Sequence, residues 1–257
     1  MADSHCHYDD SAFDKDRDKL LDAMLLGENS AVGLLIHACT DEKSALYGIK
    51  MAETYENYYT SVGFHPECCD RLPEDYIGIL EGLAGRSDKI VAVGEVGLDY
   101  HYDGYDRELQ IRLLCDQIEF AQKHGLPLIF HCRDATADFL EIMRKYRPRG
   151  VVHCFSGSPE VARELVGLGL YVGFTGVLTF KNAKKVKKSF CAVPTDRILL
   201  ETDCPYMAPE PYRGKRCTSD MIEYTAEAGA ALIGVTPQEL VDKARENTER
   251  LFNIHIT

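Results

Sequence analysis

The chain has 257 residues, 45% of them hydrophobic, and its 41 acidic against 29 basic residues give a formal net charge of −12. This length suits one large domain with a substantial core, and an α/β barrel commonly takes about 250 residues. The negative charge argues against a protein that coats nucleic acid by general electrostatics. It does not argue against an enzyme that meets phosphates through metal ions.

The sequence contains no apolar run of the roughly 18 residues needed to span a bilayer, and no apolar segment follows a basic N-terminus. We therefore expect a soluble protein of the cytoplasm, or of the nucleus in a eukaryote. The ten cysteines predict reduced, mostly buried thiols, because disulfide frameworks are typical of short secreted chains.

Short apolar segments without polar alternation recur along the chain. Such runs are typical of strands buried on both faces of a parallel sheet. The residues before His5 predict a very short first strand. Seven more strands are predicted at residues 33–38, 58–64, 90–95, 127–131, 150–155, 171–176 and 197–202.

Amphipathic segments separate these strands. The longest, at 107–125, has apolar residues at helical spacing and ends in a glycine. A helix at 236–252 is expected to cap the fold. Other helices are predicted at 14–28, 42–54, 73–85, 134–146, 158–169 and 183–190. This alternation favours a (β/α)8 TIM-type barrel in a single domain, residues 1–257, with an open doubly wound sheet as the alternative.

Polar side chains stand where the predicted strands end. In a barrel these ends meet at one face, so the side chains lie close together. Imidazole and carboxylate ligands suit Zn²⁺, Mn²⁺, Fe²⁺ or Mg²⁺. Six ligands exceed the needs of one tetrahedral ion, so we expect two divalent ions that share a carboxylate. The six candidates are His5, His7, Glu95, His131, His153 and Asp203, and His65 follows the third strand.

The spacing of His5 and His7 agrees with this prediction, because alternate side chains of a strand face the same side. The cysteine that follows each of four predicted ligands by one position is then out of phase with the ligands. We expect these cysteines to face the helices as small buried residues rather than to bind metal. They are Cys6, Cys132, Cys154 and Cys204.

Five segments together resemble the TatD family of metal-dependent deoxyribonucleases, which belongs to the amidohydrolase-like metallohydrolases. They are DSHCH, GEVGLDY, PLIFHCRDA, HCFSG and ETDCPY. The resemblance extends from residue 3 to about residue 216. It implies phosphodiester hydrolysis in DNA by a 3′→5′ exonuclease that acts on single strands or DNA ends. The cofactors would be two divalent ions (Mg²⁺, Mn²⁺ or Zn²⁺), and the protein would be a monomer or weak oligomer.

The resemblance also implies individual roles. His5 and His7 would bind a first ion, and His131 and His153 a second. Glu95 would bridge the two ions. Asp203 would hold the first ion and orient or deprotonate the attacking water.

For the substrate, the resemblance implies contacts from His65, Arg133 and Arg213. Two positions depart from the family. Ala2 replaces a bulky apolar residue before the first aspartate, and Cys217 stands where an asparagine is common. The segment around Cys217 is expected to touch substrate. The resemblance therefore defines the type of reaction more firmly than the substrate specificity.

Several weaker features have two interpretations. Five lysines in 180–190, with Arg213, Lys215 and Arg216, form either a solvated surface or a contact for a DNA backbone. Three tyrosines after the fourth strand either stack on a base or pack within their loop. They are Tyr100, Tyr102 and Tyr105. His37, at the end of the second strand, is expected to be structural.

Two other functions compete with the nuclease. One is an amidase, lactonase or phosphotriesterase on the same barrel, although Glu95 stands where such enzymes often carry a carboxylated lysine. The other is a protein that uses metal only for stability. Structural sites are usually closed and have four ligands, so six ligands favour an open, reactive site.

Overall fold

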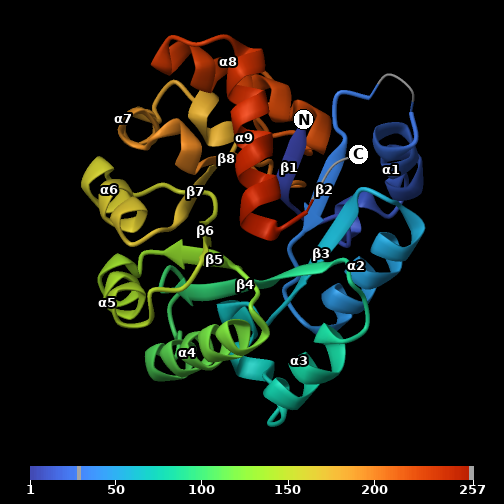
Figure 1. Ribbon diagram of the computed structural model, residues 1–257, viewed down its shortest axis with the longest axis vertical. Helices are drawn as coiled ribbons and strands as arrows, with labels where there is room; N and C mark the ends of the chain where they lie inside the picture. The colour runs from blue at the N-terminus through green and yellow to red at the C-terminus, as the bar shows by residue number, and fades with distance from the viewer. Residues whose placement is uncertain (28–29, 255–257) are drawn as a thin grey trace.

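The computed structural model describes residues 1–27 and 30–254, and its eight parallel strands form one sheet in the order β1 to β8 (Figure 1). The strands are β1 (Ala2–Cys6), β2 (Leu34–His37), β3 (Tyr58–Val62), β4 (Ile90–Asp99), β5 (Leu128–Arg133), β6 (Gly150–Val152), β7 (Tyr171–Phe174) and β8 (Ile198–Leu200). A parallel bridge between Cys6 and Cys204 brings β1 next to the end of β8. The predicted (β/α)8 barrel is confirmed.

Helices surround the sheet (Figure 1). They are α1 (Arg17–Leu25), α2 (Glu42–Thr54), α3 (Tyr76–Ala84), α4 (Arg107–His124), α5 (Thr136–Tyr146), α6 (Pro159–Gly167), α7 (Lys184–Ala192), α8 (Ile222–Ile233) and α9 (Pro237–Phe252). None of those in the described part of the chain combines the length and apolar character that a membrane crossing requires. The predicted helix at 14–28 begins three residues too early, and residue 28 lies outside the described residues.

The helix that follows β8, α8, was not predicted from the sequence. Its buried face includes small residues, Ala226, Gly229 and Ala230, and no side chain caps its first turn. Small residues give a weak amphipathic signal, because the stripe of large apolar side chains that usually marks a helix is thin. The predicted helix at 236–252 is α9, an additional element.

Strand alternation divides the core into two layers. Leu34, Ile36 and Leu199 belong to one apolar cluster, which also contains Phe252 and Ile254 from the end of α9 and beyond. Leu35 and other strand residues of opposite phase belong to the larger cluster beneath the helices. The end of α9 therefore covers the inner cluster, as the prediction of a capping helix required.

Several strands end at other positions than predicted, and three of these differences concern the ligands. β4 extends to Asp99 rather than ending at Glu95. β6 and β8 end earlier, at Val152 and Leu200, so His153 and Asp203 lie in the loops just beyond them.

Asp3 links the first strand of the barrel to the segment that follows the last strand. Its buried carboxylate accepts hydrogen bonds from the Thr202 backbone N–H at 2.9 Å, the Thr202 hydroxyl at 2.5 Å and the His5 backbone N–H at 3.3 Å. The segments that carry His5 and Asp203 are thus linked through one side chain.

Gly97 allows close pairing between β4 and β5. A Cβ at this position would lie 1.9 Å from the carbonyl oxygen of His131, its partner in the ladder. We expect Gly97→Ala to destabilise the fold by about 2 kcal/mol or more, because the strands would have to separate. Urea unfolding of the purified protein measures this change.

Gly82→Ala in α3 is the control, since a Cβ there meets nothing within 4 Å. Alanine should leave stability unchanged or raise it by up to about 1 kcal/mol. Equal stability of Gly97→Ala and wild type would contradict the packing argument.

Candidate metal centre

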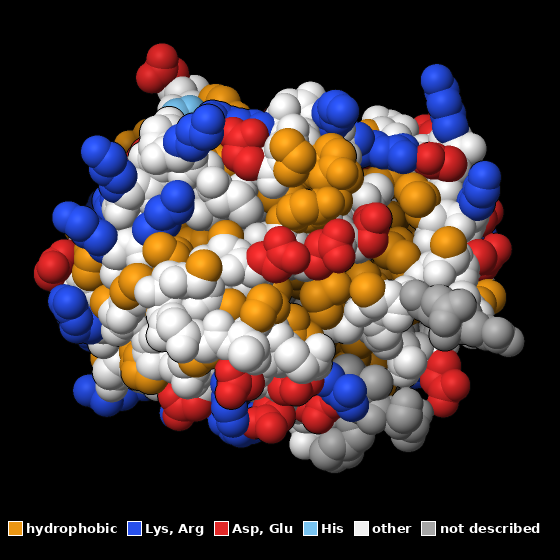
Figure 2. All heavy atoms as spheres, turned by 90° about the horizontal axis from the view of Figure 1, so that it is seen from above, with side chains coloured by type: hydrophobic (Ala, Val, Ile, Leu, Met, Phe, Trp, Pro, Cys, Tyr) orange, Lys and Arg blue, Asp and Glu red, His pale blue; other side chains and the backbone are white. Residues whose placement is uncertain are grey.

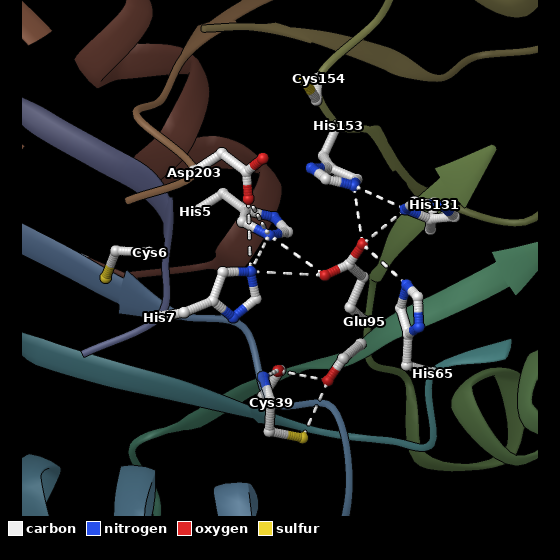
Figure 3. Close-up of polar contacts among 12 residues, drawn as sticks. His5, Cys6, His7, Cys39, His65, Glu95, His131, His153, Cys154 and Asp203 are labelled. Carbon is white, nitrogen blue, oxygen red and sulfur yellow. Dashed lines mark hydrogen bonds and ion pairs between the residues drawn. The ribbon is translucent and has the colours of Figure 1, made fainter. Parts of the chain in front are cut away.

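The six predicted ligands meet at the carboxyl-terminal end of the barrel (Figure 3). His5 comes from β1, Glu95 from β4 and His131 from β5, and the other three follow β1, β6 and β8. Five of the six are buried, and His131 is partly exposed. Among the described residues, the groups of three that could hold a metal are His5–Glu95–His153, His5–His7–Asp203 and His65–Glu95–His131.

The first group of ligand atoms surrounds one oxygen of Glu95. The Nε2 atoms of His5 and His7 lie 3.0 Å apart. Glu95 Oε2 is 3.3 Å from His5 Nε2 and 3.6 Å from His7 Nε2. Asp203 Oδ1 lies 3.3 Å from His7 Nε2 and 3.6 Å from His5 Nε2. Four ligand atoms therefore face one point.

The second group surrounds the other oxygen of the same carboxylate. Glu95 Oε1 is 2.9 Å from His131 Nδ1 and 2.7 Å from His153 Nε2, and these two nitrogens lie 3.2 Å apart. Glu95 thus directs one oxygen at each group (Figure 3).

These separations fit divalent cations. Bonds of about 2.0–2.1 Å place neighbouring ligand atoms about 3.0 Å apart in octahedral and about 3.4 Å apart in tetrahedral geometry. The distances within both groups cluster around these values. The donor set of imidazole nitrogens and carboxylate oxygens suits Zn²⁺, Mn²⁺ or Mg²⁺ more closely than it suits a soft ion.

The charges of the cluster also favour a cation. Burial alone would raise the pKa of Glu95, but His153, His65 and His5 outweigh it and hold this pKa well below its usual range. Burial opposes ionisation of Asp203 too, yet its hydrogen bond with His7 and the neighbouring imidazoles keep its pKa below the usual range. Two ionised carboxylates in a buried site require positive charge beside them.

The two histidines of the first group differ in basicity. Burial lowers the pKa of His7, but its hydrogen bond with Asp203 and the charge of Glu95 prevail and raise it to about 10. Burial and the neighbouring His153 lower the pKa of His5 to about 3. Of the two facing imidazoles, His7 is therefore the more basic.

Asp99, which the sequence analysis did not identify, orients His131. Its Oδ2 accepts a hydrogen bond from His131 Nε2 at 2.8 Å, so that Nδ1 faces Glu95 and can bind a cation once it has lost its proton. Carboxylates of this kind fix the tautomer of ligating histidines. The signal was present in the sequence, because Asp99 is four residues after Glu95 in one strand and so shares its face.

Glu201 is a second buried carboxylate that the sequence analysis missed. Its Oε1 lies 3.9 Å from His153 Nδ1, and it accepts a hydrogen bond from the backbone N–H of Cys154. Burial raises the pKa of Glu201 to about 8. It therefore lies behind the ligand group as a largely neutral side chain near pH 7.

The tautomer of His65 separates it from the ligands. Its Nδ1 accepts a hydrogen bond from the Glu67 backbone N–H at 3.2 Å, so the proton of the neutral ring is on Nε2. Nε2 points at Glu95 Oε1 from 3.4 Å. In this state His65 donates a hydrogen bond to Glu95 instead of offering a lone pair.

The two predicted arginines lie in different surroundings. Arg133 is at the end of β5, with Nη1 4.0 Å from Asp99 Oδ2 and its guanidinium over the ring of Tyr102. The guanidinium of Arg213 lies 4.3 Å from the ring centre of Phe180. Arg133 is therefore next to Asp99, the partner of His131, whereas Arg213 is exposed and packs on Phe180.

Arg216 does not serve as a free contact for a DNA backbone, as one interpretation of the sequence had it. Its guanidinium forms two hydrogen bonds of 2.7 Å with Asp16 and lies over the ring of Phe13. This pairing anchors the loop to the segment before α1.

Two of the three tyrosines after Glu95 serve loop packing. The rings of Tyr100 and Tyr105 stack on each other at 4.5 Å, and the Tyr100 hydroxyl donates to Asp138. Tyr102 remains 58% exposed beside Arg133. Tyr102 is thus the most exposed of the three and the one in contact with Arg133.

The cysteines face away from the ligand groups. Cys6 and Cys154 point outward in Figure 3, and Cys132 and Cys204 pack with the cluster beneath the helices. His37 is buried with its Nε2 3.2 Å from the Ser44 hydroxyl, a structural position behind His7.

The role of Asp99 leads to a prediction. Asp99→Ala should weaken the binding of Mn²⁺ or Zn²⁺ about 10- to 100-fold, because His131 loses the partner that orients it. Titration against a chromogenic chelator measures the affinity. Asp134→Ala is the matched control, since that carboxylate pairs with His101 on the exposed rim. Unchanged affinity in Asp99→Ala would contradict the orienting role.

The protonation of the cluster predicts a pH dependence of metal affinity. A ligating nitrogen must lose its proton, and the pKa is raised to about 10 for His7 and about 9 for His131. Protons therefore compete with metal below these values, and Mn²⁺ affinity should rise as pH increases from about 6 to about 9. Calorimetry in two buffers of different ionisation enthalpy should detect the released protons. Constant affinity without proton release would contradict the assignment.

Comparisons with known proteins agree with this geometry. The family model described as TatD related DNase matches residues 2–253. The uncharacterized metal-dependent hydrolase YabD of Bacillus subtilis is 37% identical over 259 residues, which cover 99% of this chain and 100% of that protein. The uncharacterized metal-dependent hydrolase YcfH of Escherichia coli K12 is 35% identical over 257 residues, covering 99% and 96%.

A solved structure gives the same result. The crystal structure of YjjV, a TatD homolog from Escherichia coli K12, superposes with a TM-score of 0.92 at 30% identity, covering 99% of this chain and 98% of that one. With a family match over almost its whole length and ligand groups that fit divalent cations, the chain belongs to the TatD family of metal-dependent hydrolases.

Proposed function

We propose that this hydrolase cleaves phosphodiester bonds in single-stranded DNA, or at DNA ends, as a 3′→5′ exonuclease. The observation that carries the proposal is the position of Glu95, whose two oxygens each face a separate group of ligands. Two ions about 3.5–4 Å apart are a common arrangement for hydrolysing phosphate esters. The family description, TatD related DNase, supports DNA as the substrate class.

Divalent ions, when bound, would supply Lewis acidity toward water and the phosphate oxygens. Asp203 is an ionised carboxylate at the edge of the first group, where it can orient a water molecule and accept its proton. His65 Nε2–H and the Arg133 guanidinium lie on the side of the second group. Both can donate hydrogen bonds to the non-bridging oxygens and stabilise the charge that develops there.

The proposal predicts a specific digestion pattern. A 5′-labelled single-stranded oligonucleotide should shorten from its 3′ end when Mg²⁺ or Mn²⁺ is present. EDTA, Glu95→Ala and Asp203→Ala should each reduce the rate at least about 100-fold, because each removes the activation of water. Gel electrophoresis of timed samples measures the ladder.

Asp103→Ala, which removes an exposed carboxylate from the loop after β4, is the control and should retain the wild-type rate. Circular dichroism establishes that all variants are folded. If the folded, metal-loaded wild type leaves DNA intact, the proposed substrate is wrong, and amides, lactones and phosphotriesters become the next substrates to test.

A further inference from the structure

Exposed side chains occur in the loop that begins beside the metal centre after Asp203 and in the segment that leads into α7. We call six of them the rim strip: Tyr206, Met207, Arg213, Lys181, Lys184 and Lys185. We propose that the rim strip binds the single-stranded nucleic acid next to the bond that is cleaved, through one stacked base and several backbone phosphates. This inference rests on the proposed function and adds the path of the substrate.

Tyr206 forms the end of the rim strip nearest the metal centre. Its ring centre lies 6.5 Å from that of His7, and the side chain is 53% exposed. Its hydroxyl donates to Asp10 Oδ2 at 2.8 Å, which holds the ring in place. An exposed aromatic ring that is already fixed can stack on a base at little cost in conformational entropy.

The loop after Tyr206 connects this ring to the basic part of the strip. The backbone N–H of Glu210 donates to the Thr179 hydroxyl at 2.8 Å, so the loop lies against the segment that follows β7. Farther along, the guanidinium of Arg213 covers the ring of Phe180, the residue directly before Lys181. These contacts place Arg213 and Lys181 on one surface.

The lysines of the strip are available for an anionic ligand. Lys181, Lys184 and Lys185 are exposed, and none forms an ion pair with another described residue. The first turn of α7 contains no acidic residue. Lys123 and Arg216, in contrast, are neutralised by Glu81 and Asp16.

The strip is basic although the chain has a net charge of −12. Figure 2 shows several Lys and Arg side chains along its left edge, the side on which α5, α6 and α7 lie in Figure 1. A local basic surface beside an exposed aromatic ring fits a single-stranded nucleic acid, whose phosphates repeat along the strand while its bases offer flat faces.

The test compares a triple variant of the strip with a control of equal charge change. The strip variant is Lys181→Glu, Lys184→Glu and Lys185→Glu. The control is Lys50→Glu, Arg86→Glu and Arg147→Glu, three exposed cations late in α2 or in the loops before β4 and β6. Two Mn²⁺-dependent substrates are used: a single strand of about 15 nucleotides, and thymidine 5′-(p-nitrophenyl phosphate), which is too short to reach the lysines.

For the long substrate, the strip variant should lose at least about tenfold in kcat/KM, and its log–log salt dependence should decrease in slope by about 2, as expected for three lost phosphate contacts. Hydrolysis of the short diester should stay within about twofold of wild type, and the control variant should behave as wild type on both substrates. Equal effects of the two triple variants on the long substrate would overturn the proposal.

Equilibrium binding keeps the inference testable if the proposed function fails. Fluorescence anisotropy in EDTA measures the affinity of the same labelled strand without hydrolysis. A wild type that cleaves neither substrate refutes the proposed function, and weaker binding by the strip variant alone would still support the rim strip. Identical binding by wild type, strip variant and control would overturn it.

Tyr206 has a separate readout in the same binding assay. Tyr206→Ala should weaken binding about 5- to 100-fold through loss of stacking, and Tyr206→Phe should retain most of the affinity because the ring remains. Equal affinity of Tyr206→Ala and wild type would overturn the stacking end of the strip.

Discussion

The site depends on one buried carboxylate that faces two groups of imidazoles. Glu95 is 3% exposed, and its oxygens lie 2.7–3.6 Å from nitrogens of His5, His7, His65, His131 and His153. An ionised carboxylate can stay buried only beside positive charge. Without metal, protons on His7 and His131 supply that charge, and divalent cations would supply it more effectively.

The barrel brings the ligands together from short segments that are far apart in the sequence. Parallel strands bring their carboxyl ends together, so ligands distant along the chain become neighbours. Gly97 lets β4 approach β5 between Glu95 and Asp99, which aligns the shared carboxylate with His131. Asp3 links the segments that carry His5 and Asp203, where the first strand of the sheet lies next to the end of the last strand. Backbone packing and site geometry are therefore coupled at the same residues.

Much of this could be predicted from the sequence because it follows local rules. Buried parallel strands appear as apolar runs, and period-2 alternation explains why His5 and His7 share a face while Cys6 does not. The small residues of α8 gave no comparable signal. The tautomer of His65, the Arg216–Asp16 pair and the Tyr100–Tyr105 stack depend on contacts between distant segments, which no local pattern contains.

We propose that two cations share Glu95, and a crystal soaked in Mn²⁺ and measured at the manganese absorption edge tests this directly. We expect two anomalous peaks about 3.5–4 Å apart, one between His5, His7 and Asp203 and the other beside His131 and His153. Glu95→Ala should lower the occupancy of both. A single peak away from Glu95, or full occupancy of both peaks in Glu95→Ala, would contradict the shared carboxylate as the basis of the site.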